Sequence, residues 1–256
     1  MKELELVEAQ IAAACERSGR RREDVKIVAV TKTHGPEVVE EAFAAGLRIV
    51  GENKVQEAMW KKPQCDSRIS WHLIGHLQTN KVRHALETFD FIHSVDSVKL
   101  LGKIQQTADE TGARPSVLLE VNVSGEKSKS GMKIKEVPHA LEFAMMECPR
   151  ISIEGFMTMA PFSENPEDAR PYFRRLKDLQ IQMRKVSGLY LNELSMGMSG
   201  DFVPAIEEGA TFIRLGTVLF GERPRLRRQV SPDGGEFSGG GLDSYSGAGP
   251  TFKVMD

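Results

Sequence analysis

The sequence predicts an α/β fold, a single (β/α)8 TIM barrel with a helix before it and a disordered tail after it. Short apolar runs alternate with amphipathic stretches between residues 26 and 216, which is the pattern of parallel strands joined by crossover helices. Eight such units match the usual size of a TIM barrel. A doubly wound sheet is the alternative. That fold usually begins with a glycine-rich turn, and the sequence has neither a G-x-G-x-x-G nor a Walker A run.

The helix before the barrel is expected at residues 2–18, where Leu4, Val7, Ile11 and Ala14 recur at helical spacing. Strands are expected near residues 26–31, 47–51, 70–75, 90–95, 116–123, 152–159, 193–198 and 212–216. Helices are expected between them, near residues 36–45, 54–61, 79–87, 97–111, 133–147, 166–187 and 202–208.

The chain is expected to divide into a barrel domain at residues 1–224 and a flexible tail at residues 225–256. Residues 229–250 are dense in Gly, Ser, Pro and Asp. Such a stretch cannot bury enough apolar surface to order itself.

The composition is that of a soluble globular protein. Of the 256 residues, 40% are hydrophobic and 27% are charged, and the net charge of -2 argues against nucleic-acid binding by bulk electrostatics. No apolar run is long enough to span a membrane, and the charged N-terminus is unlike a signal peptide. Cys15, Cys65 and Cys148 are scattered and lack the spacing of metal ligands. We therefore expect unpaired thiols and a cytoplasmic location.

Lys32 follows a predicted buried strand and is the candidate nucleophile. Residues 25–30 are almost all Val, Ile or Ala, which favours a strand covered on both faces, and Gly35 with Pro36 marks a turn after it. In an apolar cleft the pKa of a lysine falls. The neutral amine can then form a Schiff base with a carbonyl compound or with pyridoxal phosphate. The alternative is that Lys32 extends its ammonium group to the surface.

The ends of the last two predicted strands carry groups suited to a phosphate. The loops after the seventh and eighth strands of a TIM barrel often bind phosphate at the mouth where the carboxyl ends of the strands meet. Ser199 follows the seventh strand, and Gly216 and Thr217 follow the eighth. Their hydroxyls and backbone N–H groups are what an anion needs. Because Lys32 would face this cradle, a phosphorylated aldehyde such as pyridoxal phosphate fits both ends.

His72 and His76 do not predict a metal site. On a helix their spacing would place both rings on one face, but residues 71–76 have the pattern of a strand. Four strand residues span roughly 13 Å, which is too far for one ion. We therefore expect no metal ligands.

Eight stretches resemble one known family in order along the chain. They are AVTKTH (29–34), GENKVQE (51–57), WHLIGHLQTNK (71–81), HSVDS (93–97), VNVSGEKSKSG (121–131), GFMTM (155–159), LSMGMSGD (194–201) and RLGT (214–217). On these motifs the chain resembles the pyridoxal phosphate homeostasis protein family, also called the YggS or proline synthase co-transcribed family. The fold of that family is the alanine racemase N-terminal barrel.

The resemblance implies that pyridoxal 5'-phosphate (PLP) is the cofactor and that Lys32 holds it as an aldimine. Ser199, Gly216 and Thr217 would hold the phosphate, and Arg214 would lie near the pyridine nitrogen or the phosphate. The resemblance also implies that Asn53 and His76 line the face of the cofactor.

The resemblance implies a protein that holds PLP and maintains intracellular PLP (vitamin B6) and amino-acid homeostasis, without robust catalytic activity, and no residue is assigned a catalytic role. The alternative is a PLP-dependent amino acid racemase. Racemisation by two bases needs a group on each face of the cofactor. In alanine racemases a tyrosine from a C-terminal β-domain of the partner subunit is the second base. The chain ends before such a domain, and Tyr172, Tyr190 and Tyr245 fall outside the predicted strand ends.

We therefore expect a monomeric PLP carrier that contacts neither nucleic acid nor membrane. PLP-dependent apoenzymes or a regulatory protein are its candidate protein partners.

Overall fold

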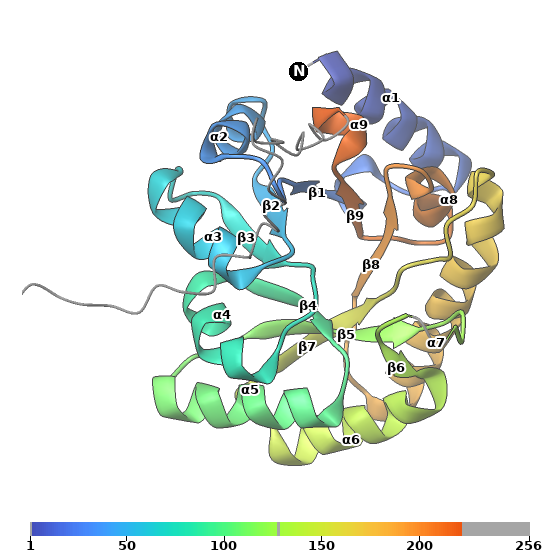
Figure 1. Cartoon of the computed structure of the whole chain (residues 1–256). Coiled ribbons are helices and arrows are strands. Elements are labelled where there is room, and N and C mark those ends of the chain that lie inside the picture. Colours follow the sequence, from blue (N-terminus) through green and yellow to red (C-terminus); the bar gives the residue numbers. More distant parts are fainter. Residues whose placement is uncertain (1, 127–128, 222–256) are drawn as a thin grey trace, which may run out of the picture. The chain divides into compact units, whose positions relative to one another are not determined.

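Eight parallel strands form a closed barrel in the computed structural model, which describes residues 2–126 and 129–221 (Figure 1). The strands are β1 (Lys26–Val30), β2 (Ile49–Glu52), β3 (Ser70–Leu73), β4 (Phe91–Val95), β5 (Ser116–Asn122), β7 (Ser152–Met157), β8 (Glu193–Met198) and β9 (Phe212–Leu215). They neighbour one another in the order β4-β3-β2-β1-β9-β8-β7-β5, and the pairing of β4 with β5 closes the ring. All these pairings are parallel, so the carboxyl ends of the strands surround one mouth.

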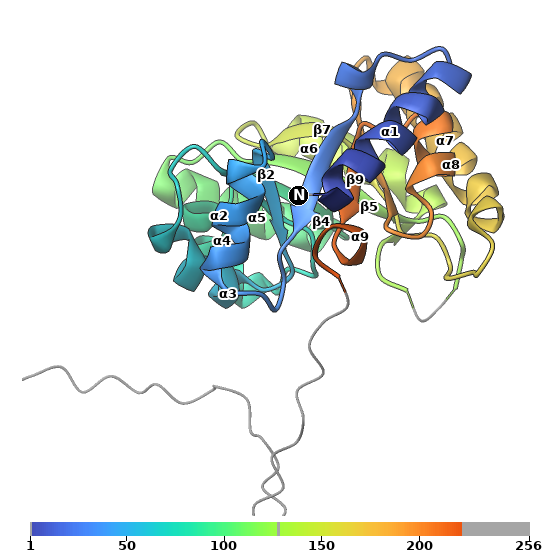
Figure 2. The same ribbon diagram turned by 90° about the horizontal axis from the view of Figure 1, so that it is seen from above.

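Helices surround the barrel, as Figure 1 shows. They are α1 (Lys2–Arg17), α2 (Pro36–Ala44), α3 (Val55–Lys61), α4 (Val82–Thr88), α5 (Val98–Thr111), α6 (Val137–Glu147), α7 (Arg170–Ser187), α8 (Phe202–Glu207) and α9 (Thr217–Phe220). The leading helix α1 packs against α8 and α9, and Figure 2 shows it beside them. None of the helices in the described part of the chain is long and apolar enough to cross a membrane.

The apolar pattern of the sequence explains why these elements form. In α1 the buried residues are Val7, Ile11, Ala14 and Cys15, which recur every three or four positions and so share one face of the helix. In β1, by contrast, all residues after Lys26 are buried, as expected for a strand with the barrel interior on one side and helices on the other. The strands are therefore rigid supports for the residues that follow them.

The predicted TIM barrel and its leading helix are confirmed, and the structure contains each expected strand. The second strand runs from 49 to 52 instead of 47 to 51. The helices expected at 79–87, 133–147 and 166–187 have an α-helical part that starts three or four residues later, after a 3-10 turn.

Two short elements escaped prediction. The strand β6 (Met132–Lys133) pairs with the end of β5, and α9 has only four residues, so neither is long enough to show a periodic pattern. The expected tail at 225–256 lies outside the described residues.

Candidate cofactor site at the carboxyl ends of the strands

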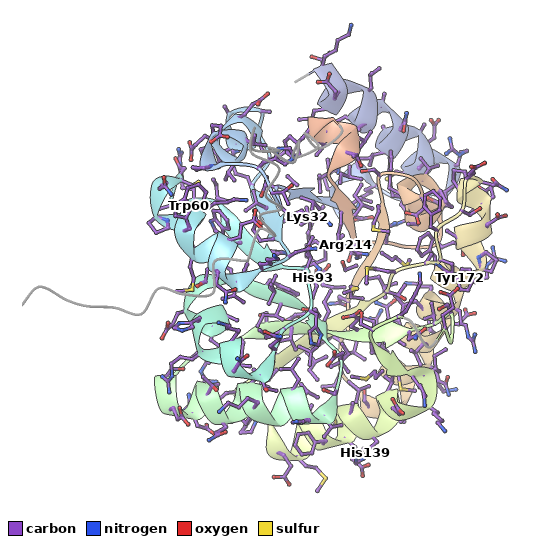
Figure 3. All side chains as sticks on the ribbon, viewed as in Figure 1. Lys32, Trp60, His93, His139, Tyr172 and Arg214 are labelled. Carbon is purple, nitrogen blue, oxygen red and sulfur yellow. The ribbon has the colours of Figure 1, made fainter. Side chains whose placement is uncertain are left out.

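All seven predicted cofactor-binding residues lie at or just after the carboxyl end of a barrel strand. Lys32 follows β1, Asn53 follows β2, His76 follows β3, Ser199 follows β8, and Arg214, Gly216 and Thr217 lie at the end of β9. In Figure 3, Lys32, Arg214 and His93 lie within the ring of strands, whereas Trp60 and Tyr172 lie outside it, on α3 and α7. The mouth of the barrel therefore gathers an amine, a guanidinium group and several hydroxyl and amide groups.

The turn that carries Lys32 rests on a group of charged residues that we call the Lys61 cluster: Lys61, Glu52 and Glu57. The ammonium group of Lys61 donates to Glu52 Oε1 at 2.8 Å, to Glu57 Oε1 at 2.7 Å and to the carbonyl of Thr31 at 2.9 Å. These three bonds use all three donors of the ammonium group. The same two carboxylate oxygens accept from the Thr31 hydroxyl at 2.6 Å and from the Thr33 amide at 2.5 Å. The backbone is thus held on both sides of half-buried Lys32.

Two features show that this arrangement requires support from its surroundings. Thr33 has a φ of 69°, a left-handed conformation that β-branched residues rarely adopt. Glu52 is fully buried, burial raises its pKa, and its Oε2 atom has no hydrogen-bond partner in the described part of the chain. Without the Lys61 ammonium group, the Glu52 carboxylate would be a buried charge with no ion-pair partner.

Arg214 places a buried positive charge at the end of β9. Its Nη1 donates to Ser195 Oγ at 2.7 Å, and its Nη2 donates to the carbonyl of Thr158 at 2.9 Å. The side chain belongs to a residue only 4% exposed, and burial lowers its pKa to about 10, against the opposing effect of Asp201 and Glu120. The guanidinium group therefore stays cationic at neutral pH.

The start of α9 presents donors suited to an anion. The amides of Gly216 and Val218 donate to Ser199 Oγ at 3.3 and 3.4 Å, which is at the long end of the hydrogen-bond range. Thr217 is exposed and adds a second hydroxyl. Loosely bonded amides and hydroxyls around one point are well placed to bind phosphate oxygens.

Asn53 and His76 lie at the rim of the mouth, in the loops that follow the neighbouring strands β2 and β3. Gly75 must be a glycine here, since a Cβ at that position would lie 2.4 Å from the carbonyl oxygen of Asn53. His76 is 59% exposed, and its Nδ1 lies 3.2 Å from the Asp96 carboxylate. Asn53 is half-buried, whereas His76 is exposed.

Sequence reasoning missed Lys61 and Glu120 as residues near the site. A signal for Lys61 is present in the sequence: it falls on the same helical face as Val55 and Ala58, where an apolar residue is expected, and all three are buried. Glu120 offers a similar signal, because it is a charged residue within the apolar run of β5, where all residues from Val117 to Val121 are buried. Among the residues that the structure describes, no group of three His, Cys, Asp or Glu side chains is arranged to hold a metal ion.

Comparisons with known proteins agree with this geometry. The sequence pattern of the alanine racemase N-terminal domain matches residues 4–224. A pyridoxal phosphate homeostasis protein of Aquifex aeolicus is 44% identical over 215 residues, which cover 84% of this chain and 94% of that protein. The chain belongs to the pyridoxal phosphate homeostasis protein family.

Solved structures of other proteins support the same assignment. PipY of Synechococcus elongatus PCC7942, solved with PLP bound, has a TM-score of 0.74 and 36% identity, and the match covers 82% of this chain and all of PipY. An alanine racemase of Clostridium difficile has a TM-score of 0.68 at 14% identity, with 88% of this chain and 58% of the racemase covered. The racemase shares the fold, whereas PipY and the Aquifex protein share the family.

Proposed function

We propose that this protein binds PLP reversibly through Lys32 and keeps the cofactor available in the cell, without robust catalysis of its own. The proposal rests on three complementary groups that lie at the same mouth of the barrel. They are Lys32, on a turn fixed by hydrogen bonds, the Arg214 cation, and the hydrogen-bond donors at the start of α9. The names of the relatives and the PLP bound to PipY support the choice of ligand.

The residues at the mouth fit PLP at both of its ends. PLP supplies an aldehyde that a lysine amine attacks reversibly, and a phosphate that carries negative charge. Lys32 would take the aldehyde end. Ser199, Gly216 and Thr217 would hold the phosphate, Arg214 would lie near the pyridine nitrogen, and Asn53 and His76 would line the exposed face.

Two observations favour a carrier over an amino acid racemase. If Arg214 faces the pyridine nitrogen instead of the phosphate, its positive charge would disfavour a proton on that nitrogen, because the two charges would repel each other. An unprotonated ring withdraws electrons weakly from a bound amino acid. The described tyrosines also lie outside the ring of strands: Tyr172 is on α7, among the surrounding helices in Figure 3, and Tyr190 is 81% exposed in the loop before β8. No described tyrosine therefore takes the place of a second base.

The test is to measure binding and exchange on one sample. Purified protein is titrated with PLP, and the loaded protein is then incubated with D-alanine and with L-alanine in deuterated water. We expect saturable PLP uptake and negligible exchange of the α-proton. Rapid exchange would show that the protein is a racemase. Failure to take up PLP would exclude both the carrier and the racemase functions.

A pair of serine variants tests the phosphate end. Ser199→Ala removes a hydroxyl from the proposed phosphate site and should weaken PLP binding by roughly tenfold or less, the value of one hydrogen bond. Ser152→Ala is the control, since Ser152 begins β7 at the opposite end of the barrel. Equal affinities for the two variants would place the phosphate elsewhere.

We also propose a cytoplasmic, monomeric protein in which residues 1–224 bind the cofactor and residues 225–256 form a separate tail. The three unpaired cysteines fit a reducing compartment, and the family match ends at residue 224. Candidate partners are PLP-dependent apoenzymes or a regulatory protein. Sedimentation of the full chain tests the oligomeric state.

A further inference from the structure

A chain of hydrogen bonds, buried except at its Ser70 end, crosses the interior of the barrel and ends on Arg214. Arg214 Nη1 lies 2.7 Å from Ser195 Oγ, and the same oxygen lies 2.9 Å from His93 Nδ1. His93 Nε2 lies 2.9 Å from His72 Nδ1, and His72 Nε2 lies 3.2 Å from Ser70 Oγ. Ser70 is the first residue of β3, and Arg214 is near the end of β9. The chain therefore runs from the amino-terminal end of the barrel to its mouth.

The four members behind Arg214 are polar groups in apolar surroundings. Phe91 and Phe212 pack against both imidazole rings, with phenyl and imidazole centroids 5.1 to 5.6 Å apart. The charged groups near the rings are Lys26, whose ammonium lies 4.5 Å from the centre of the Phe212 ring, and Arg214. Burial lowers the pKa of His72 to about 3 and that of His93 well below its usual range. Both histidines are therefore neutral at neutral pH.

Because an arginine can only donate, the chain has one consistent direction. Ser195 Oγ accepts from Arg214, and its only other partner in the described part of the chain is His93 Nδ1. Ser195 is fully buried, so its hydroxyl proton would be unpaired unless it is donated to His93 Nδ1. Neutral His93 must then carry its proton on Nε2 and donate it to His72 Nδ1. Neutral His72, in turn, carries its proton on Nε2 and donates it to Ser70.

We propose that Ser195, His93 and His72 are positioning residues that hold the Arg214 guanidinium group at the mouth. Each bond of the chain polarises the next, so the lone pairs of Ser195 are kept toward the buried cation. Ser195 and the Thr158 carbonyl take two of the five guanidinium donors, which fixes the plane of the group and leaves the others for a ligand. The use of Arg214 toward PLP rests on the proposed function, whereas the direction of the chain does not.

The first test reads the direction of the chain in the cofactor-free full-length protein. Nitrogen-15 NMR of histidine-labelled protein distinguishes the two neutral tautomers, and spectra of His72→Gln and His93→Gln assign the signals. We expect both rings to be neutral and protonated on Nε2, with no change between about pH 5 and about pH 8. A proton on Nδ1 of either ring would overturn the proposal, whatever the protein binds.

The second test reads the consequence for Arg214. His93→Phe removes the acceptor of the Ser195 hydroxyl, while His93→Gln restores it, since the amide oxygen accepts and the amide nitrogen donates toward His72. We expect His93→Phe to weaken PLP binding roughly tenfold and to shift the absorption band of the bound cofactor, and His93→Gln to bind and absorb like the wild type. His139→Phe, on α6, is the control.

The outcomes separate this inference from the proposed function. If His93→Phe changes the unfolding midpoint but leaves PLP affinity and the absorption band as in the wild type, the series of hydrogen bonds is only structural and the proposal fails. If wild-type protein takes up no PLP, the proposed function fails while the tautomers still decide the direction of the chain. If His93→Phe does not fold, Ser195→Ala replaces it and should show the same shift of the band, whose absence would also overturn the proposal.

Discussion

Replacing Lys61 with methionine should be among the most damaging single changes near the mouth. Lys61→Met keeps most of the volume of a side chain that is 1% exposed but removes its ammonium group, which donates to two carboxylates and a carbonyl. The side chain of Glu52 is 0% exposed and then keeps, among the described residues, only the Thr31 hydroxyl as a hydrogen-bond partner. Breaking a buried ion pair in this way costs about 3–5 kcal/mol of the free energy of unfolding. The total free energy of unfolding of a typical domain is only about 5–15 kcal/mol.

The assay is equilibrium urea unfolding, with two further variants as controls. Lys62→Met changes the next lysine, which is about one-third exposed, lies 3.8 Å from Asp90 and donates to the carbonyl of Thr88 at 2.6 Å, so its loss should cost about 1–2 kcal/mol. The double variant Lys61→Met, Glu52→Gln removes both buried charges and should recover most of the loss. If Lys61→Met costs no more than Lys62→Met, the Lys61 cluster does not support the Lys32 turn and the reasoning is wrong.

Two other predictions concern the rim and the buried histidines. Gly75→Ala should lower the free energy of unfolding by about 1–3 kcal/mol or more, because the new Cβ would clash with the backbone of Asn53. The control is Gly102→Ala in α5, whose new Cβ would contact only Phe143, at 3.7 Å, and which should be neutral or stabilising. Equal melting temperatures for the two variants would contradict this prediction. Burial lowers the pKa of His72 from 6.5 to about 3, so between these values the unfolded chain binds the proton more readily and stability falls as pH decreases. His72→Gln should make that decline shallower by up to about 1.4 kcal/mol per pH unit. The measurement is urea unfolding of the wild type and the variant at about pH 7 and about pH 5. An equal loss of stability in the two proteins would show that His72 is not buried as a neutral ring.

The fold was largely predictable because each barrel strand carries a local signal. A strand such as β1 is a short apolar run with a turn after it, and the alternation with amphipathic helices then defines the barrel. The positions of Lys32, Ser199 and Thr217 followed from the same signal, since a residue after a parallel strand must lie at the mouth. What could not be predicted was the short α9, whose four residues are fewer than two helical turns.

The partners of Arg214 depend on the register of the barrel strands, so their contacts could not be predicted from the sequence. His93 and Ser195 are 102 residues apart in the chain, and only closure of the barrel brings their side chains within 2.9 Å. Lys61 shows the opposite case, in which a helical pattern held the information: a lysine at an apolar position of α3 marks a buried charge that needs partners. A charged residue on the buried face of a helix is therefore a feature to examine in other sequences of this fold.

The most direct test of the central claim is to trap the cofactor on its proposed lysine. Wild-type protein and the Lys32→Ala variant are each incubated with PLP, reduced with borohydride, digested and examined by mass spectrometry. The account predicts that the wild type carries the mass of the reduced cofactor on Lys32 and that Lys32→Ala has neither this modification nor the visible absorption band of the bound cofactor. A modification found only on other lysines, or an unchanged band in Lys32→Ala, would contradict it.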